Sequence, residues 1–340
     1  MPATRFDLDA TAMAALVAGE PGYRVVQLRQ GLLAGHEPED ITTLPKALRS
    51  RLAAEPALGP GLAQVRRSVG DGGATVKWLW RLADGPLVET VLMHYRARST
   101  VCVSSQAGCA MACGFCATGQ SGFSRHLTAG EIVEQVVRAR AEADRTGHRV
   151  ANVVFMGMGE PLANYDRVWA AVEILHDDIG LSARHLTLST VGVVPGIERL
   201  ATEALPVNLA VSLHAANDAL RDTLVPLNRR YPLARLAAAC RVYLAATNRR
   251  LSFEWALIDG VNDRPGDATE LAAYARAVGA HVNLIPLNPT PGYATPGTPP
   301  GRVLEFRERL ANLGVNATVR RTRGTDIDAA CGQLRAIPIS

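Results

Sequence analysis

Hydrophobic and polar positions follow two alternating periods along most of the chain. From residue 100 onward, short apolar runs are separated by longer stretches in which apolar side chains recur every three or four positions. The short runs predict buried strands, and the longer stretches predict amphipathic helices. We expect strands at 100–104, 153–156, 185–190, 207–214, 251–258, 281–286 and 315–320. We expect helices starting at Thr128, at 165–176, near Ile197, and at 233–246, 267–278 and 302–313.

This order of elements predicts parallel strand–helix–strand units. Six or seven such units are too few to close an eight-stranded barrel, so we expect an α/β fold in the form of a partial, open parallel β/α barrel. In barrels of this kind, polar residues at the carboxyl ends of the strands line the site.

The first hundred residues have a different pattern. Residues 1–68 predict short helices, one capped by Asp9, one opened by Pro21 and one carrying Leu48 and Leu52 on a single face. Residues 69–98 begin with a Gly-Asp-Gly-Gly turn and predict strands at 74–80 and 87–93. We therefore divide the chain into a small helical accessory domain (1–68), a β-hairpin or small-sheet connector (69–98) and a main domain (99–340).

Composition limits the class of protein without deciding its function. The 340 residues are 48% hydrophobic and 20% charged, with a net charge of +4, which is compatible with nucleic-acid binding but not diagnostic of it. No apolar run reaches the ~18 residues of a membrane span. The apolar stretch 10–18 follows Asp7 and Asp9, so it does not match a signal peptide. Six cysteines without a targeting segment indicate a reducing cytoplasm.

Three of the cysteines are closely spaced. Cys109, Cys113 and Cys116 form a Cys-x3-Cys-x2-Cys pattern, which can bind a 4Fe-4S cube and leave one iron without a protein ligand. A zinc knuckle needs four ligands, and the nearby candidates Cys102 and His126 do not complete a familiar zinc pattern. A disulfide framework is disfavoured in a long chain without a secretory signal. The spacing therefore favours an iron–sulfur site.

Polar residues follow several of the expected strands. One strand ends in Gly157-Met158-Gly159-Glu160-Pro161, where two glycines allow close approach of a ligand and the carboxylate can bind an ammonium group. Each strand end alone has a simpler interpretation as a turn or helix cap. Together with the cysteine loop on one rim, they predict a ligand site. The other strand ends are Ser189-Thr190, Ser212-Leu213-His214 and Asn288.

Five motifs together resemble the RlmN/Cfr family of radical S-adenosylmethionine (SAM) RNA methyltransferases. The resemblance covers about residues 75–334, and the last motif is highly specific. In the helical segment it is looser, because Gly22-Tyr23-Arg24 stands where the family usually has a Pro-Phe-Arg-like stretch. The motifs are CVSSQ at 102–106, GMGEPLAN at 157–164, SLHA at 212–215, NLIPLNP at 283–289 and TRGTDIDAACGQL at 322–334.

The resemblance implies a barrel of the radical SAM type and two cofactors. Cys109, Cys113 and Cys116 would hold a 4Fe-4S cluster whose open iron binds SAM, and two SAM molecules would be used per turnover. Phe115 would pack near the adenine of SAM. The remaining SAM contacts implied by the resemblance are Gly159, Glu160, Ser189, Ser212, Leu213, His214 and Asn288.

The resemblance also implies roles for two further cysteines and one glutamate. Cys331 would carry the methyl group as S-methylcysteine, and Cys102 would release the product through a transient Cys102–Cys331 disulfide. Glu89, thirteen residues before Cys102, would be the proton acceptor. Taken alone, either cysteine is more often a small buried hydrophobe, and a mid-strand glutamate more often faces solvent. Cys240 lies in no motif and is expected in the core.

By resemblance, the substrate is carbon 2 of adenosine 2503 in 23S rRNA, with adenosine 37 of tRNA as a second candidate. The alternative within the same chemistry is methylation at carbon 8, of the Cfr type. The alternative from a different class is a non-catalytic, metal-containing RNA-binding module. Arg320, Arg321 and Arg323 are the expected phosphate contacts. The expected partners also include an external electron donor and a thiol reductant, the expected state is a cytoplasmic monomer, and the accessory domain either packs only or docks RNA.

Overall fold

A ten-stranded mixed sheet carries the body of the molecule in the computed structural model, which describes residues 4–96 and 98–336. The strand order is β1-β2-β3-β4-β7-β8-β9-β10-β11-β12, in which β1 to β4 are joined by antiparallel pairs and every pair from β4 to β12 is parallel. A separate two-stranded sheet pairs β5 with β6. The strands of the two sheets are β1 (Leu62–Gly70), β2 (Thr75–Leu82), β3 (Leu87–His94), β4 (Ser99–Cys102), β5 (Gln106–Gly108), β6 (Phe123–His126), β7 (Val150–Phe155), β8 (Leu186–Thr190), β9 (Asn208–Ser212), β10 (Leu251–Leu257), β11 (His281–Pro286) and β12 (Ala317–Val319).

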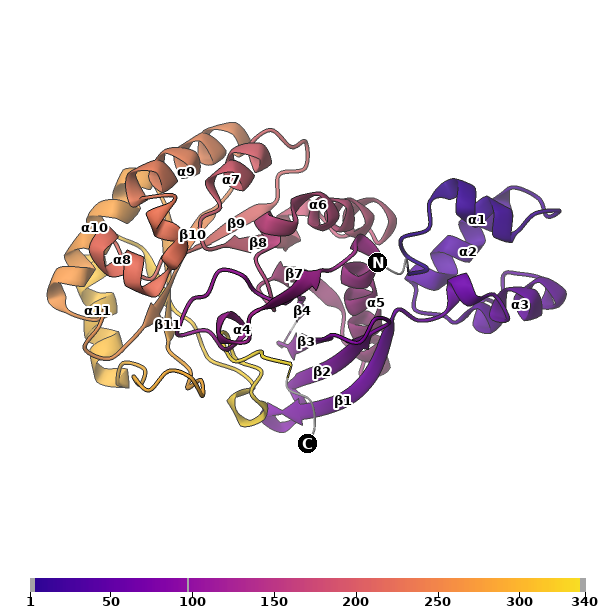
Figure 1. Cartoon of the computed structure of the whole chain (residues 1–340), viewed down its shortest axis with the longest axis horizontal. Helices are drawn as coiled ribbons and strands as arrows, with labels where there is room; N and C mark the ends of the chain where they lie inside the picture. The colour runs from indigo at the N-terminus through magenta and orange to yellow at the C-terminus, as the bar shows by residue number, and fades with distance from the viewer. Residues whose placement is uncertain (1–3, 97, 337–340) are drawn as a thin grey trace.

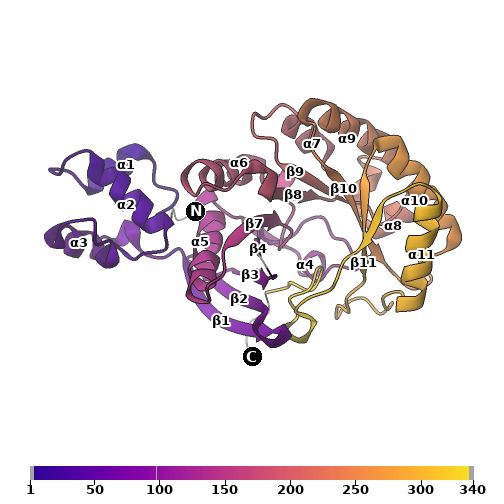
Figure 2. The same ribbon diagram turned by 180° about the vertical axis from the view of Figure 1, so that it is seen from behind.

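Helices cover the outer side of the curved sheet, and α4 with the C-terminal segment lies on its inner side (Figures 1 and 2). Among the described residues, no helix is both long and apolar enough to cross a membrane. The helices are α1 (Ala10–Leu16), α2 (Tyr23–Leu33), α3 (Lys46–Ala53), α4 (Ala117–Gln120), α5 (Ala129–Arg145), α6 (Tyr165–Glu173), α7 (Val194–Leu200), α8 (Asp218–Leu224), α9 (Leu233–Thr247), α10 (Pro265–Val278) and α11 (Pro300–Asn312).

The parallel part of the sheet confirms the open β/α barrel expected from the sequence. Strand residues such as Leu186, Phe253 and Leu284 are almost completely buried between the sheet and the outer helices. The expected cap of Asp9 on α1 and the capping box of Thr128 and Glu131 on α5 are both present.

Some elements were not expected. Residues 62–68, predicted to be part of a helical segment, belong to the edge strand β1. The mixed burial of β1 and a register shift between Gln64 and Arg66 remove the alternation that would have indicated a strand. The two-stranded β5–β6 sheet and the short helices α4 and α8 were also missed, because each is too short to show a period.

The helices α1, α2 and α3 form a unit beside the sheet, joined to it at β1 (Figure 1). Its centre contains Leu28, Leu32, Leu48 and Leu52, all buried. This unit occupies residues 10–53, so the residues predicted as one domain, 1–68, contain both these helices and the first strand of the sheet.

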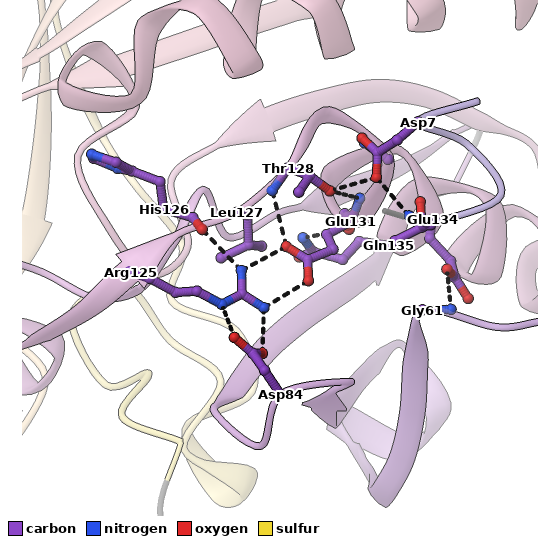
Figure 3. Close-up of polar contacts among 12 residues, drawn as sticks. Asp7, Gly61, Asp84, Arg125, His126, Leu127, Thr128, Glu131, Glu134 and Gln135 are labelled. Carbon is purple, nitrogen blue, oxygen red and sulfur yellow. Dashed lines mark hydrogen bonds and ion pairs between the residues drawn. The ribbon is translucent and has the colours of Figure 1, made fainter. Parts of the chain in front are cut away.

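The first turn of α5 joins the N-terminal segment to the body (Figure 3). The carboxylate of Asp7 accepts hydrogen bonds from the Gly130 N–H at 2.7 Å and from the Thr128 hydroxyl at 2.8 Å. A negative charge at a helix N-terminus satisfies free N–H groups and is stabilised by the helix dipole. Asp7 therefore caps α5 from a distant part of the chain.

Arg125 joins the turn between β2 and β3 to the same helix (Figure 3). Its guanidinium binds both carboxylate oxygens of Asp84, at 2.6 and 2.7 Å, and both of Glu131, at 2.8 Å each. One turn further along α5, the Glu134 carboxylate accepts the Gly61 N–H at 2.9 Å, just before β1. The first two turns of α5, together with the adjacent Arg125, therefore hold three segments of the N-terminal third. These segments are the stretch around Asp7, the residues just before β1 and the turn between β2 and β3.

We expect Asp7→Ala to lower the free energy of unfolding by about 1–2 kcal/mol, as loss of a helix cap does. Urea denaturation followed by circular dichroism measures this change. The exposed Asp40 provides the control, since Asp40→Ala should stay within about 0.5 kcal/mol of the unmodified protein. Equal stabilities for the two variants would contradict a capping role for Asp7.

Candidate active site

The cysteine triplet lies in a closed loop between β5 and β6. The Cys109 N–H donates to the Gly122 carbonyl at 2.7 Å, and the Cys116 N–H donates to the Cys113 carbonyl at 3.1 Å. A Cβ added at Gly119 would lie 2.7 Å from the Cys113 carbonyl oxygen, so a side chain at this position would clash with the returning loop. Local hydrogen bonds therefore determine the path of the three cysteines.

This loop forms one wall of an open cavity, whose space is about 1040 Å³ with the solvent at its mouth included, and the carboxyl ends of the parallel strands form the other wall. We call it the first cavity. Of the predicted SAM contacts, only Leu213 does not line it, since its side chain is fully buried in the core. The predicted residues that line the first cavity are Cys109, Cys113, Cys116, Phe115, Gly159, Glu160, Ser189, Ser212, His214 and Asn288.

Glu160 is buried in the wall of the first cavity. Its carboxylate accepts the Leu162 N–H at 3.0 Å and the Val191 N–H at 2.8 Å, which hold it in one orientation. Burial raises the pKa of Glu160 to about 7, although these N–H donors favour the charged form. An ammonium group bound nearby would stabilise the ionised form of Glu160, and the ionised carboxylate would in turn attract the ammonium group.

His214 has a left-handed backbone conformation, with φ of 59°. Its Nδ1 accepts the Ala256 N–H at 2.9 Å, and its ring meets the Phe115 ring edge-on at 4.8 Å between centroids. Burial, with a smaller effect of the Arg221 charge, lowers the pKa of His214 to about 3. The imidazole is therefore neutral and is a hydrogen-bonding part of the wall.

A second open cavity, of about 840 Å³ with the solvent at its mouth included, adjoins the first. Both Cys102 and Cys331 line it as free thiols, and Cys331 also lines the first cavity. Burial is the main cause and the neighbouring Cys331 a smaller cause that together raise the pKa of Cys102 to about 12. Loss of water around the Cys331 sulfur raises the pKa of that thiol as well. The two thiols that the motifs predicted to work together therefore face one space.

The segment 324–335, which we call the Cys331 loop, is held from both sides. On the cysteine-triplet side, the Ala117 N–H donates to the Gly332 carbonyl at 2.8 Å, and the Asn288 amide donates to the Cys331 carbonyl at 3.0 Å. On the side of the β1–β2 turn, the Gly324 N–H donates to the Asp71 carboxylate at 2.8 Å. The Cys331 loop thus connects the β1–β2 turn to the rim of the barrel.

Glu89 lines neither cavity. Its carboxylate is buried, lies 3.0 Å from the Lys77 ammonium and accepts the Arg335 N–H at 3.0 Å. The solvent-facing interpretation of this mid-strand glutamate is therefore wrong. Its predicted role as proton acceptor stays a prediction.

Two charged residues of the first cavity were not predicted there. Glu254, on β10, is buried, and its Oε1 accepts hydrogen bonds from Ser252 and Asn283, both at 2.8 Å. Arg320 lines both cavities, although the sequence indicated only a phosphate contact for it. A lone carboxylate in the apolar run 251–257 was the available signal for Glu254.

The donor set of the loop suits an iron–sulfur cluster, because three thiols from one closed loop line the same wall. Burial raises the pKa of Cys109 to about 12 and raises that of Cys113 as well, so these groups are thiols until a metal displaces their protons. In the described part of the chain, no three His, Cys, Asp or Glu side chains are arranged to hold a single metal ion.

Comparison with known proteins assigns the chain to a family. Residues 103–272 match the Radical SAM superfamily. A protein of Chloroflexus aurantiacus, named "Probable dual-specificity RNA methyltransferase RlmN", is 54% identical over 332 residues, covering 93% of this chain and 88% of that protein. A protein of Roseiflexus sp. with the same name is 48% identical, covering 97% of this chain and 95% of that protein. The chain belongs to the RlmN family of radical SAM RNA methyltransferases.

The RlmN family likeness extends to the whole fold. The crystal structure of a radical SAM methyltransferase from Sphaerobacter thermophilus superposes with a TM-score of 0.94 at 49% identity, covering 99% of this chain and 100% of that one. Family membership confirms the resemblance drawn from the motifs and implies use of SAM, a 4Fe-4S cluster and an RNA substrate. It argues against the non-catalytic RNA-binding module.

The buried neutral His214 predicts a pH-dependent stability. Its pKa is lower in the folded protein than in the unfolded chain, so its stabilising effect is present above pH 6.5 and is lost as the pH falls toward 3. We expect His214→Asn, whose side-chain oxygen can replace Nδ1 as acceptor, to lack this part of the acid destabilisation, which is at most about 5 kcal/mol.

Urea denaturation at pH values from 4 to 7 measures the difference. His185→Asn, at an exposed position, is the control and should follow the unmodified protein. Parallel pH curves for His214→Asn and the unmodified protein would contradict a buried neutral imidazole.

Proposed function

We propose that this chain methylates carbon 2 of adenosine 2503 in 23S rRNA, and adenosine 37 of tRNA as a second substrate. The observation that carries the proposal is the pair of adjoining cavities, one lined by the cysteine triplet and the other by Cys102 and Cys331. The names of the relatives, which describe dual-specificity RNA methyltransferases, support two RNA substrates.

The first cavity is the proposed cofactor site. Cys109, Cys113 and Cys116 would hold the 4Fe-4S cluster and leave one iron open for SAM. When bound, the cluster and two SAM molecules per turnover supply the methyl group and the radical that removes a hydrogen atom from it. Gly159 and Glu160 would bind the methionine ammonium, which suits the fixed, buried carboxylate of Glu160. Ser189, Ser212, His214 and Asn288 would complete the pocket, with Leu213 contributing through its main chain.

The second cavity is the proposed site of RNA chemistry. Cys331 would carry the methyl group, and its carbon would become bonded to the adenine ring. Glu89 would take the proton from the substituted ring carbon. The Cys102 thiolate would then attack the Cys331 sulfur and form the disulfide. The electron pair of the breaking bond between the Cys331 sulfur and the methylene carbon would pass to that carbon, which takes up a proton and becomes the methyl group of the product. An external thiol reductant would restore the two thiols, and an external electron donor would serve the cluster.

Positive residues beside the second cavity are the proposed RNA contacts. Arg320, Arg321 and Arg323 all line it, and the Arg323 guanidinium lies over the Tyr95 ring at 4.5 Å. Contacts between arginine and phosphate fix the position of the RNA, and the target base must leave its stack to reach Cys331 in the second cavity. We further propose that the helical segment within 1–68 docks RNA, and that the protein works as a cytoplasmic monomer.

The position of methylation is tested on the product. Treated 23S rRNA, digested to nucleosides and analysed by mass spectrometry, should contain 2-methyladenosine at position 2503. The unmodified protein without SAM is the control and should give none. 8-Methyladenosine as sole product would replace this proposal with the carbon-8 alternative.

The role of Cys102 is tested by Cys102→Ala. Because the protein–RNA thioether could no longer be resolved, we expect this variant to accumulate covalently attached RNA, approaching one RNA per chain, and to release almost no product. Denaturing electrophoresis and mass spectrometry measure the adduct.

Cys240→Ala is the matched control, since Cys240 is buried in the core and lines neither cavity. It should turn over without accumulating the adduct. Cys102→Ala protein that is free of RNA and carries only S-methyl-Cys331 would contradict the mechanism.

A further inference from the structure

Side-chain alternation places Glu89 on the face of β3 that looks toward the second cavity. Glu89, Val91 and Met93 are spaced two apart on one strand, so they project to the same side of the sheet. Val91 and Met93 line the second cavity. Glu89 lies one step further along this face, where the Cys331 loop covers it through the Arg335 N–H.

Register across four strands places Lys77 on the same face. Lys77 is paired with Val91, Val91 with Cys102, and Cys102 with Val154. Residues directly opposite in neighbouring strands point to the same side, and the last three of these line the second cavity. Lys77 is therefore the outer member of a row that contains the resolving thiol.

The Lys77 ammonium binds two groups from different parts of the chain. It lies 3.0 Å from the Glu89 carboxylate and donates to the Asp328 carbonyl at 2.9 Å. Both charged side chains are buried. The ammonium thus connects the predicted proton acceptor directly to the Cys331 loop.

We propose that Lys77 is a positioning residue of the methylation reaction, which holds the Glu89 carboxylate toward the second cavity and joins it to the Cys331 loop. The inference rests on the proposed function, because it concerns the group that takes the ring proton. When Glu89 accepts that proton it loses its charge, and the ammonium keeps its hydrogen bond to Asp328. The acceptor and the methyl-carrying loop are therefore held by one group.

A purely structural ion pair explains these contacts less well. Buried ion pairs are often no more stabilising than apolar side chains of similar size, so stability alone does not require one here. The residue type is also informative, since only Lys46 and Lys77 are lysines among 36 lysine and arginine residues. A compact ammonium with three donors can serve a carboxylate and a carbonyl at one point, which suits this position better than a planar guanidinium.

The first experiment uses the two lysines as probes. Anaerobic, cluster-loaded protein labelled with ¹⁵N-lysine should give two side-chain ammonium signals by NMR, assigned with Lys46→Arg. We expect hydrogen exchange at Lys77 to be about a hundredfold slower than at the exposed Lys46. Glu89→Gln should speed exchange at Lys77 by about tenfold or more. Equally fast exchange at both lysines, or no effect of Glu89→Gln, would overturn the inference.

The second experiment separates positioning of Glu89 from loss of the loop. Lys77→Met should slow RNA methylation by about tenfold or more, with the KM for RNA within about twofold. With RNA deuterated at carbon 2 of the target adenine, the isotope effect on the rate of RNA methylation should be larger for this variant than for the unmodified protein, because removal of the ring proton becomes slower. Methylation of Cys331 by the first SAM should continue, because the loop keeps its bonds to Ala117 and Asn288.

Arg81→Met is the matched control, because Arg81 is exposed on the same strand, and it should behave like the unmodified protein. Lys77→Met would overturn the inference if its RNA methylation were normal, or if Cys331 methylation fell in parallel with no change in isotope effect. If Lys77→Met does not fold, hydrogen exchange at the Lys77 ammonium still tests the contact between Lys77 and Glu89, because that measurement uses protein that keeps Lys77. Failure of the unmodified protein to methylate RNA would instead reject the proposed function.

Discussion

A single main-chain hydrogen bond joins the two cysteine-bearing loops, from the Ala117 N–H to the Gly332 carbonyl at 2.8 Å. The partners are the residues directly after Cys116 and Cys331, which come from opposite ends of the barrel domain. The Cys331 loop has little regular structure, so its position depends on contacts of this kind. Because Cys331 forms part of the wall between the two cavities, both cavities depend on where these contacts place the loop.

The barrel supplies the other walls through the way parallel strands end. All the parallel strands present their carboxyl ends on one rim, so residues distant in sequence meet there. Close packing at this rim requires glycine in the turn after β7. A Cβ at Gly157 would lie 2.7 Å from the Val103 carbonyl oxygen, and one at Gly159 would lie 2.5 Å from the Gln106 side chain. These contacts bring Glu160 against the cysteine loop.

Much of the barrel could be predicted because its strands are short apolar runs, whereas its helices have apolar side chains at every third or fourth position. The edge strand β1 could not, since its exposed face and register shift leave no period. The strand ends predicted the first cavity, where Ser189, Ser212 and Asn288 do meet. No local pattern indicates that Cys331 lies beside Cys102, because contacts over such a sequence separation depend on the whole fold; only the resemblance suggested it. The burial of Glu89 by Lys77 was likewise invisible, since it depends on strand pairing and on the Cys331 loop.

The place of Cys331 on the wall shared by both cavities has a consequence for speed. A side chain in such a wall can turn from one space to the other by rotation about its Cα–Cβ bond, while its backbone stays fixed. Such rotamer changes take picoseconds to nanoseconds where the side chain is accessible, far less than the microseconds to milliseconds of loop or domain motion. In the proposed reaction, transfer of the methyl group on Cys331 from the first cavity to the second therefore requires no slow rearrangement of the fold.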